Sequence, residues 1–254
     1  MPEAVYSWIN YKDMEQVNKI QDDILKAYES DFSKHTQNSE ANKISLIWNS
    51  IPSQLAKENK KFLYQVIKEG ARAREYENAL NWLNDANLIY KIYNVKKADM
   101  PLKAYNDLSS FKIYMNDVGL LRRMANLDSR IVVEGDKLFE EFKGALTENY
   151  VLQTLTTQFE VVPRYWSQAN PPYEVNFLIQ RENDIFPIEV KSEDNTTSRS
   201  LKKFKELFPD QVKLRVRFSL DNLKLDDDLL NIPLFMADYT NQLIGFALEQ
   251  KKTS

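Results

Sequence analysis

The sequence has 254 residues, of which 43% are hydrophobic, so it is long enough for one large core or two modest ones. Its formal net charge of −3 excludes a surface that is basic throughout, so any contact with nucleic acid must come from a local patch. The lack of cysteine excludes disulfides and thiolate zinc sites. We expect a cytoplasmic protein with no membrane contact, because the sequence has neither a visible signal peptide nor an apolar stretch of about 20 residues.

Histidine and glycine usage excludes several kinds of active site. His35 is the single histidine and lies in a polar stretch, which excludes Ser-His-Asp catalysis and histidine-rich metal sites. The five glycines form neither a GxxxxGK[ST] phosphate loop nor a GxGxxG fingerprint. We therefore expect no ATP site in this chain.

Residues 1–95 are predicted to be mainly helical. Asp13 and Gln16 have the spacing of a capping box, and apolar residues then recur every three or four positions. A polar run over residues 33–43 is predicted to be a loop, and Pro52 is predicted to interrupt the helix that follows. The expected helices cover residues 14–32, 44–51, 55–67 and 73–87.

The pattern changes to β after this helical part. Residues 88–95 and 109–117 are rich in β-branched and aromatic side chains, as in a two-stranded ribbon. Short helices followed by such a ribbon have the layout of a winged helix, with the helix over 73–87 as its recognition helix. In this interpretation DNA is contacted by Arg72, Arg74, Lys91, Lys96 and Lys97. The alternative is that these charges only solvate a surface.

The last part of the chain is predicted to have an α/β core. A long amphipathic helix over 133–159 precedes a β-hairpin over 174–191, and a second helix precedes a strand over 213–220. Lys202 and Lys203, on the second of these helices, suit contact with phosphate, although a charged helix face is more often just solvated.

The hairpin carries the residues that suggest chemistry. Glu189 and Lys191 flank Val190, so both point to the same face of a strand, and Asn176 is expected opposite Glu189 on the first strand. Glu148, on the preceding helix, supplies a further carboxylate. Carboxylate and amide oxygens bind Mg²⁺, which activates water against a phosphodiester, while a lysine orients that water or neutralises charge. We therefore take Glu148, Asn176, Glu189 and Lys191 as candidate catalytic residues, the first three being candidate metal ligands.

The order of helix glutamate, strand, then E-x-K resembles the PD-(D/E)XK nuclease superfamily. Over nearly the whole chain, the sequence is also similar to the C-terminal region of a bacterial and archaeal family of AAA-type ATPases of unknown function. The matching phrases are "MPEAV", "KIQDDILKAYESDFSKH", "FKIYMNDVGLL", "FKGALTENYVLQ", "EVNFLI" and "PIEVKS". The resemblance implies an α+β chain with three segments: a helical one over 1–40, a winged-helix-like domain over 41–130 and a restriction-endonuclease-like α/β domain over 131–254.

The same resemblance implies that the chain lacks an ATPase domain, since "MPEAV" usually follows that domain in the family. It also implies that Asn176 stands where the family usually has aspartate, so that Mg²⁺ binding is weak and any phosphodiesterase activity is lost or reduced. We expect a DNA-binding portion of an AAA-type ATPase, with the ATPase domain or subunit as its partner. Two alternatives stay open: an active Mg²⁺-dependent DNA endonuclease, and a protein-interaction or regulatory module that touches no nucleic acid.

Overall fold

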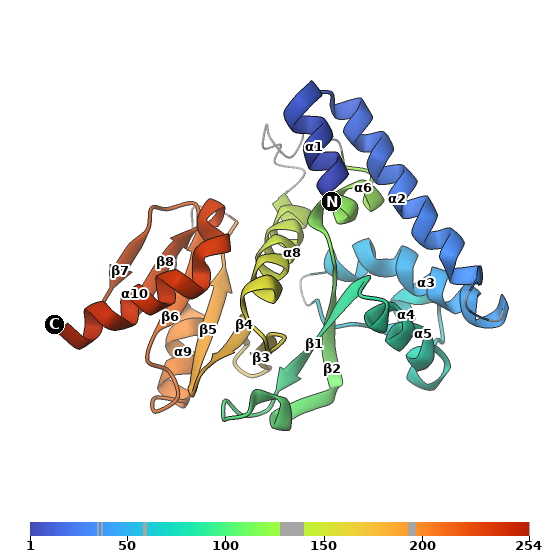
Figure 1. Cartoon of the computed structure of the whole chain (residues 1–254). Helices are drawn as coiled ribbons and strands as arrows, with labels where there is room; N and C mark the ends of the chain where they lie inside the picture. Colours follow the sequence, from blue (N-terminus) through green and yellow to red (C-terminus); the bar gives the residue numbers. More distant parts are fainter. Residues whose placement is uncertain (35, 37, 58–59, 128–139, 193–196, 254) are drawn as a thin grey trace. The chain divides into compact units, whose positions relative to one another are not determined.

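The computed structural model describes the chain except for residues 35, 37, 58–59, 128–139, 193–196 and 254 (Figure 1). The fold class predicted from the sequence is confirmed, because the N-terminal part is helical and the C-terminal part combines helices with a mixed sheet. His35 and the expected start of the helix over 133–159 lie outside the described residues.

Contacts between residues divide the chain into two units. The first unit consists of Met1–Lys91 and Ile113–Leu146, and the second consists of Ile92–Lys112 and Thr147–Ser254. The second unit therefore takes a short stretch from the N-terminal half of the sequence. The three segments expected from the resemblance stay a prediction.

The first unit is built from helices that pack around buried aromatic side chains. Phe32 and Trp48 are 1% and 0% exposed, and the Phe32 ring meets the rings of Trp48 and Trp82 edge-on at 5.7 and 5.6 Å. The helices of this unit are α1 (Pro2–Tyr11), α2 (Met14–Lys34), α3 (Asn38–Leu55), α4 (Tyr64–Ile67), α5 (Ala73–Asp85) and α6 (Val118–Met124).

Two of the predicted helix boundaries are confirmed. Asp13 caps α2, since its Oδ1 accepts hydrogen bonds from the backbone N–H groups of Glu15 and Gln16 at 2.9 and 3.2 Å. Helix α5 covers Ala73–Asp85, close to the predicted 73–87.

The predictions for the region between these helices are partly wrong. Helix α3 begins at Asn38 and continues through Pro52, because Ile47, Ile51 and Leu55 are all buried and their packing offsets the backbone hydrogen bond that proline cannot donate. In the stretch predicted as a third helix, the described helix is only the single turn of α4.

The second unit is organised around a sheet with the strand order β2-β1-β3-β4-β5-β6-β8-β7. Its strands are β1 (Ile89–Val95), β2 (Asn106–Met115), β3 (Arg164–Gln168), β4 (Tyr173–Arg181), β5 (Asp184–Val190), β6 (Arg215–Ser219), β7 (Lys224–Asp226) and β8 (Leu229–Pro233). The two strands predicted as a wing are β1 and β2. Strand β1 also pairs in parallel with β3, with Asn94 beside Tyr165, so the ribbon is part of the larger sheet.

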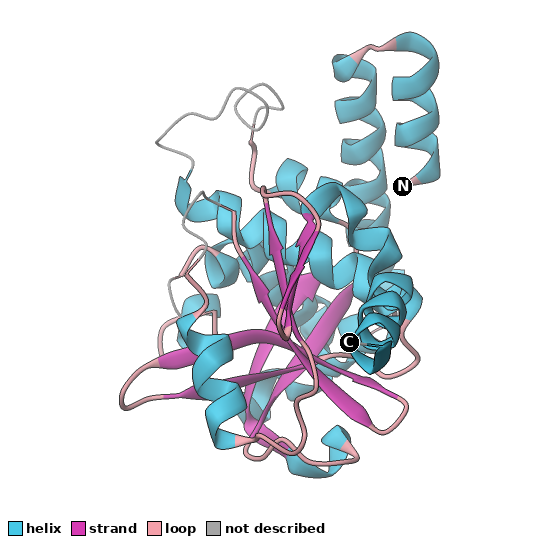
Figure 2. Ribbon diagram, turned by 90° about the vertical axis from the view of Figure 1, so that its left-hand side faces the viewer, coloured by secondary structure: helices cyan, strands magenta, loops and turns pink. Residues whose placement is uncertain are grey.

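Helices cover both faces of the central strands. Helices α9 (Arg199–Leu207) and α10 (Thr240–Thr253) lie on opposite sides of the sheet (Figure 2). On the α9 side, Leu201 and Phe204 pack in one cluster with Val175 and Leu178 of β4. The unit also contains the short helices η1 (Leu102–Tyr105) and η3 (Leu234–Tyr239), and most of α8 (Glu140–Gln158). In the part of the chain that the structure describes, no helix combines the length and apolarity needed to cross a membrane.

Candidate functional site

The predicted hairpin is present with the expected register. Strands β4 and β5 are antiparallel, with Phe177 beside Ile188 and Leu178 beside Pro187. The same register, continued by one residue, places Asn176 opposite Glu189. Both faces of this strand pair are buried near its middle. Phe177 and Ile188 point to one face, Leu178 points to the other, and all three side chains are fully buried. Asn176 and Glu189 therefore lie next to a middle stretch of the strand pair that is buried on both faces.

Glu189 is the buried carboxylate of this site. The residue is 5% exposed, and its Oε1 pairs with the ammonium group of Lys191 at 2.9 Å. Its other oxygen, Oε2, is buried and has no hydrogen-bond partner among the described residues. A buried carboxylate oxygen without a partner is unfavourable, and it is the atom here best suited to receive a cation.

Asn176 uses its amide oxygen within the hairpin. Its Oδ1 accepts a hydrogen bond from the backbone N–H of Val190 at 3.0 Å, which ties β4 to the end of β5. An amide oxygen engaged in this way carries no charge and has one lone pair fewer for a metal. The sequence predicts the position of Asn176, but not this backbone contact.

Glu148 lies on α8 and is 6% exposed. Among the described residues, no group of three or more carboxylate, histidine or cysteine side chains could hold a metal ion. Mg²⁺ takes oxygen ligands in near-octahedral geometry. In the hairpin, Oε1 of Glu189 already pairs with Lys191 and Oδ1 of Asn176 already accepts the Val190 N–H, which leaves Oε2 of Glu189, so these donors fit Mg²⁺ poorly.

A small cavity opens beside the hairpin. Its volume is about 250 Å³, and it is lined by Glu189, Lys191, Thr197, Arg199 and Ser200. A neighbouring cavity of about 460 Å³ shares Thr197 and Arg199 with it and continues along the start of α9 to β6. Together the two cavities place basic and hydroxyl side chains next to the buried glutamate.

The basic residues predicted to contact DNA are distributed over both units. In the first unit, Arg72 is the N-cap of α5 and Arg74 follows in its first turn; both are exposed, whereas Lys91 is half-buried.

In the second unit, Lys96 and Lys202 are exposed. Lys97 pairs with Asp99 at 2.6 Å, and this hydrogen bond raises the pKa of Lys97. Lys203 pairs with Glu206 at 3.3 Å. Arg72, Arg74, Lys96 and Lys202 are thus better placed to meet a phosphate than the two lysines that already face a carboxylate.

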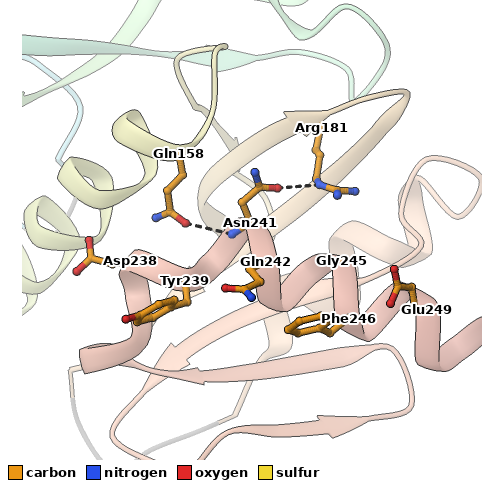
Figure 3. A pocket seen from close by; sticks show the side chains of 9 residues that line it. All are labelled: Gln158, Arg181, Asp238, Tyr239, Asn241, Gln242, Gly245, Phe246 and Glu249. Atoms are coloured by element: carbon orange, nitrogen blue, oxygen red, sulfur yellow. Dashed lines mark hydrogen bonds between the residues drawn. The ribbon is translucent and has the colours of Figure 1, made fainter.

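A further hollow, of about 380 Å³, lies along α10 and was not predicted from the sequence (Figure 3). Its polar side chains bond to one another: Arg181 Nε donates to Asn241 Oδ1 at 2.8 Å, and the Asn241 backbone N–H donates to Gln158 Oε1 at 3.1 Å. Gln158 Nε2 in turn donates to the carbonyl of Ala237 at 2.9 Å. These contacts fix the start of α10 against α8 and β4, and they do not resemble an acid–base pair.

The fold and the site define a mixed α+β protein whose sheet carries a hairpin with one buried glutamate and one amide. By its sequence, the chain belongs to the family defined by the domain of unknown function DUF8612, whose model matches residues 1–131. Residues 143–235, which include the hairpin, match a second domain of unknown function, DUF4143, which is typically associated with AAA-ATPase-type proteins. No curated protein and no solved structure gives a significant match.

Proposed function

We propose that the chain is a cytoplasmic, DNA-binding portion of an AAA-type ATPase protein, and that its nuclease-like hairpin has little or no cleavage activity. The observation that carries this proposal is that two side-chain oxygens of the hairpin already have partners: Oε1 of Glu189 pairs with the ammonium group of Lys191, and Oδ1 of Asn176 accepts the backbone N–H of Val190. A hairpin arranged in this way is stable without a second anionic ligand. The winged-helix-like and restriction-endonuclease-like assignments are part of this proposal.

The DNA-binding part of the proposal rests on local basic groups in a chain whose net charge is −3. Arg72 and Arg74 stand exposed at the start of α5, the helix that a winged-helix layout would use for recognition. Lys96 and Lys202 are exposed in the second unit. Phosphate contacts of this kind must weaken steeply as salt is raised.

The link to an ATPase rests on the DUF4143 match together with the resemblance of the sequence. In this proposal the ATPase domain or subunit is the partner of the chain. The ATPase would move or load DNA, and this chain would bind that DNA.

An active Mg²⁺-dependent endonuclease is the second candidate, and one observation favours it. The unpartnered Oε2 of Glu189 is buried next to Lys191 at a cavity of about 250 Å³, and these two residue types are what metal-assisted hydrolysis uses.

We predict that the Asn176→Asp variant will nick plasmid DNA in the presence of Mn²⁺ at about 100 times the rate of the unaltered chain. The reason is that the substitution adds an anionic ligand opposite Glu189, and losing one charge-stabilising group costs about 10²-fold or more in many enzymes. The measurement is plasmid nicking, and cleavage of single-stranded DNA, by equal amounts of folded protein.

Two variants make this test specific. Asn94→Asp is the matched control, because Asn94 also accepts a backbone N–H bond on a strand of the second unit, from Ser167 at 3.1 Å. Asn176→Asp combined with Glu189→Ala should be inactive. Cleavage by the unaltered chain that Glu189→Ala abolishes would favour the endonuclease candidate instead. A gel shift at several salt concentrations tests DNA binding, and no shift at low salt would favour the regulatory module.

A further inference from the structure

The start of α9 has the features of an anion site. The cavity of about 460 Å³ at this end is lined by Thr197, Ser198, Arg199, Lys202 and Arg217, together with Arg215 of β6 and three residues at the turn between β7 and β8. The first intrahelical hydrogen bond runs from the N–H of Lys202 to the carbonyl of Ser198 at 3.1 Å. The N–H groups of the preceding helical residues thus have no acceptor within the helix, and the helix dipole adds positive potential there.

Ser198 gives a second, independent indication of a ligand. It is the N-cap residue of α9, but its side chain makes no capping hydrogen bond. The residue is 6% exposed, it lines the cavity, and its hydroxyl has no hydrogen-bond partner among the described residues. Since buried hydroxyl groups nearly always have a partner, an external group that accepts a hydrogen bond is the simplest way to satisfy this one.

The charges around the cavity favour an anion. Arg199 and Lys202 project from the first turn of α9, and Arg217 comes from β6, where its Nε donates to Asn231 Oδ1 at 2.8 Å. Arg215 also lines the cavity, but Asp228 neutralises it.

Two carboxylates oppose an anion here. Asp226 and Asp227 line the far side of the cavity and are exposed, and Asp226 pairs with Lys224 at 3.3 Å. Three cations thus face two carboxylates, one of which has its own lysine.

We propose that the N-terminal end of α9 binds a phosphate group, with the Ser198 hydroxyl and the free backbone N–H groups donating and with Arg199, Lys202 and Arg217 supplying charge. Phosphate at a helix N-terminus is a recurrent arrangement in proteins. Which molecule carries this phosphate rests on the proposed function. The carrier is either a phosphodiester of the DNA backbone or a free or terminal phosphate monoester.

The experiment titrates the intact chain with inorganic phosphate and, separately, with a short single-stranded DNA that carries or lacks a 5′-phosphate. Binding is followed by NMR through the backbone N–H signals of residues 198–202. We expect phosphate to shift these signals, and Ser198→Ala to weaken phosphate binding by about fivefold. Ser198→Ala removes an unpartnered hydroxyl, so it should not impair folding.

The contribution of charge is tested by the double variant Arg199→Gln with Lys202→Gln, which should weaken phosphate binding by at least about tenfold. For single-stranded DNA, the slope of the logarithm of the binding constant against the logarithm of salt concentration should fall in magnitude by about 0.7 per lost phosphate contact. The matched control is Lys251→Gln, because Lys251 is an exposed lysine of the same unit, and it bonds only to a backbone carbonyl among the described residues.

The outcomes separate this inference from the proposed function. Phosphate binding that the variants weaken, without any binding of DNA, would support the α9 site and overturn the proposed function. Phosphate binding that Ser198→Ala and the double variant leave unchanged, in a chain that still binds DNA, would overturn the α9 site alone. An absence of phosphate-dependent shifts at residues 198–202 would also overturn it. A preference for 5′-phosphorylated DNA would identify the terminal monoester as the carrier.

Discussion

Replacing Asp228 with alanine is expected to lower the free energy of unfolding of the second unit by about 3–5 kcal/mol. Asp228 is 1% exposed and lies just before β8. Its Oδ2 accepts a hydrogen bond from Arg215 Nε at 2.9 Å, and Lys205 contacts the same oxygen at 2.5 Å. Without the carboxylate, the Arg215 guanidinium stays in the interior with no counter-charge, which is the costly way to break a buried ion pair.

Urea unfolding, followed by hydrogen exchange in β6 and β8, measures this effect. The control is Asp226→Ala, since Asp226 is exposed and its change should alter the unfolding free energy by no more than about 0.5 kcal/mol. Asp228→Ala combined with Arg215→Met should recover much of the loss. If Asp228→Ala alone costs no more than the control, the ion pair does not stabilise the fold.

The same carboxylate should make stability depend on acid pH. Burial alone would raise the pKa of Asp228, but the hydrogen bonds from Arg215 and Lys205 outweigh burial and lower it from 3.8 to about 2. Because the folded-state pKa lies below the unfolded one, the contribution is fully present above about pH 4 and is lost as the pH falls through about 2. It amounts to about 2 kcal/mol, so acid unfolding should show a matching loss that the Asp228→Ala variant lacks.

The second large effect is expected at Lys112, a fully buried lysine on β2. Its ammonium group pairs with the carboxylate of Glu174 and lies 4.7 Å from the centre of the Tyr165 ring. Burial raises the pKa of Tyr165 to about 12, even though a hydrogen bond with Ser110 opposes this shift, so the phenol is neutral at ordinary pH. The lysine therefore depends on Glu174 for its counter-charge.

We expect Glu174→Ala to lower the free energy of unfolding by about 3 kcal/mol or more, and Lys112→Met to change it by no more than about 1 kcal/mol in either direction. The asymmetry arises because the first change leaves a buried ammonium group unpaired, whereas the second removes the charge and keeps the volume. Glu182→Ala is the control, since Glu182 is an exposed partner of Arg181. Thermal unfolding of the three variants measures their stabilities, and Glu174→Ala should be the least stable. Equal losses of stability for Glu174→Ala and Lys112→Met would contradict this prediction.

The sequence predicts best those features that depend on local patterns. The cap at Asp13, the helix over Ala73–Asp85, the hairpin with Asn176 opposite Glu189, and α9 all follow from spacing within a short window. Strands β3, β7 and β8 were not predicted from the sequence. Strand β7 has three residues with no apolar alternation, β3 is defined by its pairing with β1 and β4, and β8 is defined by its parallel pairing with β6.

The candidate site shows the same division. Its positions on the strands follow from periodicity, so Glu189 and Lys191 could be predicted to share a face. Their mutual ion pair and the bond from Val190 to Asn176 depend on side-chain conformations that burial selects. The unpartnered Ser198 hydroxyl depends on how α9 begins, which a sequence pattern does not specify.

The discontinuity of the second unit has a consequence for the order of folding during synthesis. Residues 92–112 emerge from the ribosome early, but β1 gains its parallel neighbour only after β3 has been made. Until then β1 has an open edge in the ribbon. Bringing β1 and β3 together closes a long stretch of chain, which is slow relative to local helix formation. A fragment limited to residues 143–235, the extent of the DUF4143 match, would lack β1, β2 and α10. It would expose β3 as an unprotected edge, so expression trials should keep residues 92–112 together with the C-terminal half.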